Sequence, residues 1–202
     1  GLGVPAVAVG RTDHRLGAFP SQPFALPVNV RFEIGQTGPT LVVSDASRTR
    51  SVDTAFGPVR LARDVTAAYA LAAVEFEREE SAWQSLRVGR PTAETARLRI
   101  LTPPDERKTP VVLIHGLASS PLTWVNIAND LLGDPDISEH FEIWLMRYST
   151  GLPLLVNRHL IAQRLGAYQG STNGNRVLIG HSMGGVLARL LVTDSGDSLW
   201  RA

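Results

Sequence analysis

One short segment places a serine between two glycines at the spacing G-x-S-x-G: Gly180-His181-Ser182-Met183-Gly184. A serine in this pattern acts as a nucleophile when a sharp turn exposes its hydroxyl to substrate and to a base. A turn serine that only caps a helix fits the same letters. Chance gives about 0.1 match to so loose a pattern in a chain of this length. The residues on either side of the motif therefore decide between the two interpretations.

Those neighbours favour the nucleophile. The apolar run Val177–Ile179 comes directly before the motif and predicts a strand. Apolar residues follow at helical spacing: Val186, Leu187, Leu190 and Leu191. Strand, turn and helix form the setting of a nucleophile elbow, in which Gly180 and Gly184 leave room for the turn. We expect Ser182 to be the nucleophile, and the Met183 N–H at the helix N-terminus to bind a developing oxyanion.

A second motif, His115-Gly116-Leu117, follows the apolar run Val111–Ile114. A loop of small residues at this point can turn a backbone N–H inward, and we expect Leu117 to supply the second oxyanion donor. The loss of one such donor typically costs about 2.7–4 kcal/mol of transition-state stabilisation. A plain loop turn is the alternative interpretation.

The elements that must position these motifs alternate along the chain. Apolar periodicity predicts strands at 97–101, 111–114, 141–148 and 177–179, and helices at 124–132, 160–168 and 186–191. Such alternation with short loops implies parallel strands, right-handed crossovers and helices on the sheet faces. The predicted fold class is α/β, with a mainly parallel sheet.

The region 1–96 has a different pattern. Short apolar stretches at 4–9, 26–32 and 41–43 predict the strands of a small β layer. One long helix follows, with apolar residues at helical spacing from Val65 to Phe76 and Asp64 near its start. We therefore expect a β-rich region with one helix at 1–96 and an α/β region at 97–202.

Composition excludes several classes of function. The 202 residues contain 20 Lys+Arg and 19 Asp+Glu, a net charge of +1, which argues against a nucleic-acid binder. The absence of cysteine excludes disulfides, thiolate nucleophiles and Cys-ligated zinc. No apolar run approaches the roughly 18 residues of a membrane-spanning helix. No ligand cluster, phosphate loop or dinucleotide motif predicts a metal or another cofactor.

Together, Leu113-Ile114-His115-Gly116-Leu117 and Gly180–Gly185 resemble the α/β-hydrolase superfamily, with the lipase and esterase branch closest. The resemblance covers roughly residues 97–202 and implies that they form the N-terminal half of a hydrolase domain. It implies a serine hydrolase that cleaves carboxylic esters, small-molecule or lipid, through an acyl-enzyme at Ser182, with no cofactor. It also favours the bacterial cell envelope or secretion. An acyltransferase or thioesterase on the same scaffold, and a non-catalytic interaction protein, are the alternatives.

Hydrolases with this motif have the chain order serine, then Asp or Glu, then His. Only Asp194 and Asp197 follow Ser182 as acids, and we expect Asp194 to be a surface charge at a helix end. No histidine follows Ser182. We expect packing, loop or surface roles for the five histidines of the chain: His14, His115, His140, His159 and His181. We expect a C-terminally truncated fragment whose triad Asp and His lie beyond residue 202. The isolated chain should be unstable, or self-associate through the open edge of the 177–179 strand.

Overall fold

The computed structural model describes residues 1–11, 23–35, 38–71, 95–102, 105, 107–168, 175–194 and 196. Its N-terminal region contains β1 (Val4–Arg11), β2 (Pro23–Gly35), β3 (Gly38–Asp45), β4 (Ser51–Thr54) and β5 (Gly57–Arg60). The first three form an antiparallel sheet in the order β1-β2-β3, so the three predicted strands are confirmed. The β4–β5 hairpin was not predicted, because its four-residue strands are too short to show a period.

The helix predicted after this region begins where expected. Residues 66–71 are helical, and the Asp64 carboxylate accepts a hydrogen bond of 3.0 Å from the Thr66 N–H, which caps the first turn. The remainder of the predicted helix, like His14, lies outside the described residues.

The second region contains the following elements: β6 (Arg97–Ile100), β7 (Thr109–Ile114), the 3-10 turn η2 (Pro121–Trp124), α2 (Val125–Gly133), α3 (Pro135–His140), β8 (Phe141–Arg147), α4 (Leu154–Ala167), β9 (Val177–Gly180) and α5 (Met183–Val192). The strands form a mixed sheet in the order β6-β8-β7-β9. β7 runs parallel to β8 and β9, while β6 runs antiparallel to β8. The α/β class and the mostly parallel sheet are therefore as predicted.

Helices cover both faces of this sheet. On one face, Val112 and Ile114 of β7 pack with Ile161 of α4 and Leu187 of α5. On the other, Val111 and Leu113 belong to a cluster that is completed by residues of η2, α2 and the 66–71 helix: Trp124, Ala128, Leu132 and Tyr69. Strands buried on both faces explain why 111–114 is a continuous apolar run.

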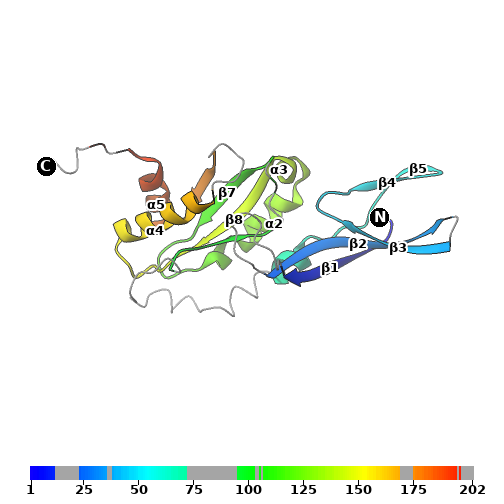
Figure 1. Ribbon diagram of the computed structural model, residues 1–202, viewed down its shortest axis with the longest axis horizontal. Coiled ribbons are helices and arrows are strands. Elements are labelled where there is room, and N and C mark those ends of the chain that lie inside the picture. Colours follow the sequence, from blue (N-terminus) through cyan, green and yellow to red (C-terminus); the bar gives the residue numbers. More distant parts are fainter. Residues whose placement is uncertain are drawn as a thin grey trace.

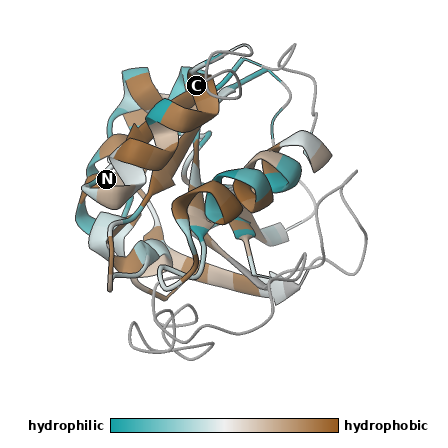
Figure 2. Cartoon of the chain, turned by 90° about the vertical axis from the view of Figure 1, so that its left-hand side faces the viewer, coloured by the Kyte–Doolittle hydropathy of each residue, from teal (hydrophilic) through white to brown (hydrophobic). Residues whose placement is uncertain are grey.

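The arrangement of the layers is visible in the figures. Figure 1 shows the β1–β3 sheet extending away from the four-stranded sheet, on the side opposite α4 and α5. Figure 2 shows helices with a hydrophobic and a hydrophilic side around hydrophobic strands. Within the described ranges, none of the helices has both the length and the apolar character needed to span a bilayer.

α3 was not predicted. Asp134, which directly follows α2, caps α3: its carboxylate accepts a hydrogen bond of 2.8 Å from the Asp136 N–H. Six residues are too few to display an apolar stripe. α3 matters because it leads into the start of β8, at the end of the sheet remote from Ser182.

Candidate active site

Ser182 occupies a tight turn between β9 and α5. β9 ends at Gly180 and α5 begins at Met183, so the turn consists of His181 and Ser182. The backbone of Ser182 has φ +52° and ψ −122°, in a region that a residue with a side chain enters only under strain. The turn is held by hydrogen bonds from the His181 N–H to the Ile114 carbonyl (3.1 Å) and from the Gly184 N–H to the His181 carbonyl (2.9 Å).

The two glycines of the motif sit where the first turn of α5 meets the ends of β7 and β9. A Cβ atom on Gly184 would overlap the carbonyl oxygen of Ile114 and would lie 2.5 Å from that of His115. A Cβ atom on Gly180 would overlap the carbonyl group of Gly184. Both clashes are with backbone, which cannot rotate aside, so any side chain at either position would push α5 off the sheet.

The loop that carries the second motif touches this turn. A Cβ atom on Gly116 would lie 3.2 Å from the Cβ of Ser182 and 3.1 Å from Nδ1 of His181. Leu117 follows directly and is 58% exposed, and Ser182 is exposed as well. The structure thus brings the two predicted motifs together at the carboxyl ends of β7 and β9.

Two backbone donors are free at this point. Neither the Leu117 N–H nor the Met183 N–H donates a hydrogen bond to any described residue. The Met183 N–H belongs to the first turn of α5, where the helix dipole places partial positive charge. Free donors next to an exposed serine are the arrangement that can stabilise an oxyanion.

Residues after β8 fix the shape of the Gly116 loop. The Tyr148 hydroxyl donates a hydrogen bond of 2.6 Å to the His115 carbonyl, and its ring stacks on the His115 ring at 4.5 Å. The Thr150 hydroxyl oxygen accepts one of 3.3 Å from the N–H of Ala118, whose φ is +51°. These contacts hold the loop in a strained conformation, so the position of Leu117 is set by the fold.

Asn157 of α4 extends this support. It is fully buried, and its amide donates hydrogen bonds to the carbonyls of Ser149 (2.8 Å) and Leu152 (3.2 Å). The segment that carries Thr150 is thereby tied to a helix. Sequence reasoning missed Tyr148, Thr150 and Asn157, although their place after a parallel strand was a signal that they lie at the same edge of the sheet as the two motifs.

His115 is a packing residue, as predicted. Its side chain is fully buried, and burial lowers its pKa to about 4, so the ring is neutral at pH 7. Its Nδ1 lies 3.0 Å from the Gly116 carbonyl, while its Nε2 has no partner in the described part of the chain. The neutral ring fills the space between the end of β7 and Tyr148.

No other described histidine can be assigned as the base. His140 ends α3, next to the first residue of β8, at the opposite end of the sheet from Ser182. His159 is exposed on α4, and His181 is exposed on the turn itself. Asp194 follows the far end of α5, which is about 15 Å long, and Asp197 lies outside the described residues.

Within the described ranges, no group of three or more His, Asp or Glu side chains could hold a metal ion. Comparison with family models, with curated proteins and with solved structures finds no match to this chain. The exposed Ser182 hydroxyl, next to the free N–H groups of Leu117 and Met183, is therefore the feature of the described residues that points to a chemistry.

Proposed function

We propose that this chain carries the nucleophile and the oxyanion hole of a serine hydrolase that cleaves carboxylic esters. The observation that carries the proposal is the backbone of Ser182, held at φ +52° between the end of β9 and the N-terminus of α5. A serine that merely capped α5 would have ordinary dihedrals and a side-chain bond to the helix, yet Ser182 makes no capping hydrogen bond. Backbone strain that no capping hydrogen bond compensates is typical of catalytic groups.

In the proposed reaction, Ser182 Oγ attacks the ester carbonyl carbon and loses its proton to a general base. The carbonyl oxygen becomes an oxyanion, which the Leu117 and Met183 N–H groups bind. Collapse of the tetrahedral intermediate breaks the bond to the alcohol, which leaves with the proton held by the base. Water then attacks the acyl-enzyme by the same steps, releasing the acid and restoring Ser182. Hydrolases with this motif take the triad acid and base from segments that follow the nucleophile, and no described residue is assigned to either role.

Apolar residues support an ester with a hydrophobic acyl or alcohol group. Leu117 is 58% exposed, and Leu154 and Leu155 at the start of α4 are 38% and 68% exposed. α4 follows β8, so these leucines lie on segments that leave the same edge of the sheet as Ser182. Ligands of open α/β sheets bind outside the carboxyl ends of the strands.

The test uses the natural protein that contains this chain. We expect hydrolysis of p-nitrophenyl esters to fall by at least about 10³-fold in Ser182→Ala, and to be unchanged in Thr40→Ala, which removes an exposed hydroxyl on β3. Activity that survives Ser182→Ala would refute the proposal. Release of p-nitrophenol that requires an added alcohol or thiol acceptor would identify an acyltransferase on the same nucleophile. Intact folding with no turnover and no acyl adduct would identify a non-catalytic interaction protein.

A further inference from the structure

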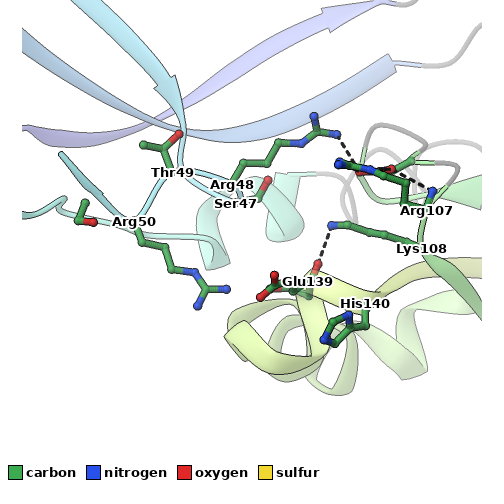
Figure 3. Close-up of a pocket in the computed structure, with 11 residues that line it drawn as sticks. Ser47, Arg48, Thr49, Arg50, Arg107, Lys108, Glu139 and His140 are labelled. Atoms are coloured by element: carbon green, nitrogen blue, oxygen red, sulfur yellow. Dashed lines mark hydrogen bonds and ion pairs between the residues drawn. The ribbon is translucent and has the colours of Figure 1, made fainter. Parts of the chain in front are cut away.

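A cavity of about 740 Å³ lies between the N-terminal region and the start of the four-stranded sheet (Figure 3). Residues 47–51, which join β3 to β4, form one wall. Asp105, Arg107 and Lys108 before β7, with residues 138–140 at the end of α3, form the other. β7 has six residues, so about 16 Å of strand separate this cavity from the Ser182 end of the sheet. The two sites are therefore distinct.

The cavity has an excess of positive charge. Four basic side chains line it (Arg48, Arg50, Arg107 and Lys108), against the two carboxylates of Asp105 and Glu139. The serine and threonine side chains of 47–51 add hydroxyl groups to the same wall. Walls of low dielectric concentrate the field of such charges within a cleft.

One of the two carboxylates is already paired. Asp105 accepts hydrogen bonds from Arg107 Nε (3.0 Å) and Nη2 (2.8 Å), and these bonds hold the pKa of Asp105 well below its usual range. Arg107 remains 84% exposed, so part of its guanidinium still faces solvent.

Arg48 and Arg50, on the wall formed by residues 47–51, interact only weakly with the described carboxylates. Arg48 lies 3.7 Å from carboxylate oxygens of Asp45 and Asp105, beyond hydrogen-bond distance. In the part of the chain that the structure describes, Arg50 forms no ion pair within 4.0 Å. Figure 3 shows the Arg50 side chain reaching from its own wall toward the wall that carries Glu139 and His140.

The backbone that presents these cations is fixed. The Thr49 N–H bonds to the Asp45 carbonyl (2.8 Å), and the Leu61 N–H bonds to the Arg50 carbonyl (2.8 Å). Across the cavity, Lys108 Nζ donates to the Ser138 carbonyl at 2.6 Å, which leaves two of its protons available. With the backbone fixed, binding of an oxyanion has to order only the arginine side chains and not the segment that carries them.

We propose that this cavity binds a small multivalent oxyanion, a phosphate ester or a polycarboxylate, between Arg48 and Arg50 on one wall and Lys108 on the other. The planar guanidinium groups match two oxygens of phosphate or carboxylate, and Lys108 adds a point charge. Because the ligand bridges the N-terminal region and the four-stranded sheet, its binding would stabilise their contact.

The test titrates the full chain with inorganic pyrophosphate and, separately, with citrate, by calorimetry at ionic strength held constant with sodium chloride. We expect saturable binding of one anion per chain, and preference for pyrophosphate or citrate identifies the ligand class. Arg50→Gln should weaken binding by about tenfold or more. Glu139→Gln should strengthen it, because a repelling carboxylate is removed. Arg60→Gln, an exposed arginine of β5 outside the cavity, is the matched control and should change nothing.

Three results would overturn the proposal. The first is no saturable binding of either anion by the unmodified chain. The second is equal weakening by Arg50→Gln and Arg60→Gln, which would indicate attraction to net charge alone. The third is a Glu139→Gln variant that binds no better and unfolds more easily, which would show that Arg50 and Glu139 form an internal ion pair. Arg50→Lys, which keeps the charge but loses the planar fork, should bind with intermediate affinity and guards against loss of folding in Arg50→Gln.

Discussion

Gly116 and Ser182 lie in contact: a Cβ atom on Gly116 would be 3.2 Å from the Cβ of Ser182. One residue follows the end of β7 and the other the end of β9, and these strands are parallel neighbours. The two motifs found separately in the sequence therefore meet at one edge of the sheet. This contact is the geometric basis for assigning the Leu117 and Met183 N–H groups to one site.

The close approach of α5 to β7 makes Gly184 indispensable. Because a Cβ atom there would overlap the Ile114 carbonyl oxygen, we expect Gly184→Ala to lower the free energy of unfolding by about 3 kcal/mol or more. Gly166→Ala on α4 is the matched control, since nothing lies within 4 Å of its added methyl group. It should raise stability by about 0.5 kcal/mol. Urea unfolding measures both, and equal effects would contradict the packing described.

The strain at Ser182 should be measurable without any substrate. Ser182→Gly removes the cost of φ +52° and loses no capping bond, so we expect stability to rise by about 1–2 kcal/mol. Ser120 also precedes a helical turn, but its φ is −139° and its side chain accepts a bond from the Leu122 N–H. Ser120→Gly should therefore lower stability by a few tenths of a kcal/mol. A Ser182→Gly variant that is less stable than the parent would show that the turn is unstrained.

The hydroxyl of Tyr148 should contribute more to the stability of the fold than the hydroxyl of Tyr69. Tyr148→Phe leaves the buried His115 carbonyl without its 2.6 Å donor, and we expect a loss of about 1–3 kcal/mol of stability. The Tyr69 hydroxyl is buried and has no partner among the described residues, so Tyr69→Phe should be neutral or stabilising. Thermal unfolding compares the two, and a larger loss in Tyr69→Phe would contradict the loop contacts.

Two buried side chains, His115 and Glu142, make the free energy of unfolding depend on pH in opposite directions. Burial lowers the pKa of His115 to about 4, so the unfolded chain binds its proton first and stability is lost as pH falls from about 6.5 to 4. Burial raises the pKa of Glu142 to about 7, so the native state keeps that proton longer and stability is lost as pH rises from about 4.5 to 7. The two contributions offset each other between pH 4.5 and 6.5.

Glu142→Gln separates the two effects. The free energy of unfolding of the parent, relative to this variant, should fall by up to about 3 kcal/mol as pH rises from 4.5 to 7. Relative to His115→Gln, the parent should instead gain stability as pH rises from 4 to 6.5. Urea unfolding across this range provides the curves. Parent and Glu142→Gln curves that stay parallel would show that Glu142 is not buried as described.

The sequence predicted most helices and strands because the residues that each element buries recur at the spacing of that element. The run 111–114 indicated a strand buried on both faces, and the flanks of Ser182 indicated strand, turn and helix. The order of the sheet was not predictable, because β6 pairs with β8 and not with its sequence neighbour β7. The direction of β6 has a local reason: the eight residues 101–108 are too few for the crossover that a parallel pair of strands requires.

The supporting residues of the site could not be identified from sequence. No supporting role was predicted for Tyr148 or Thr150, since such roles depend on which loop the end of β8 meets. The cavity at the other end of the sheet arises from Arg50 and Lys108, on segments far apart in the chain. Such juxtapositions follow from tertiary packing, for which neither hydrophobic period nor turn chemistry provides a signal.

The most direct test of the account is covalent labelling with a fluorophosphonate, which reacts only with an activated serine. Applied to the natural protein that contains this chain, followed by mass mapping of peptides, it should place one adduct on Ser182. The adduct should be absent from Ser182→Ala and retained in Thr40→Ala. An adduct that maps to another serine and survives Ser182→Ala, or a folded protein that takes up no label, would contradict the assignment of Ser182 as the nucleophile.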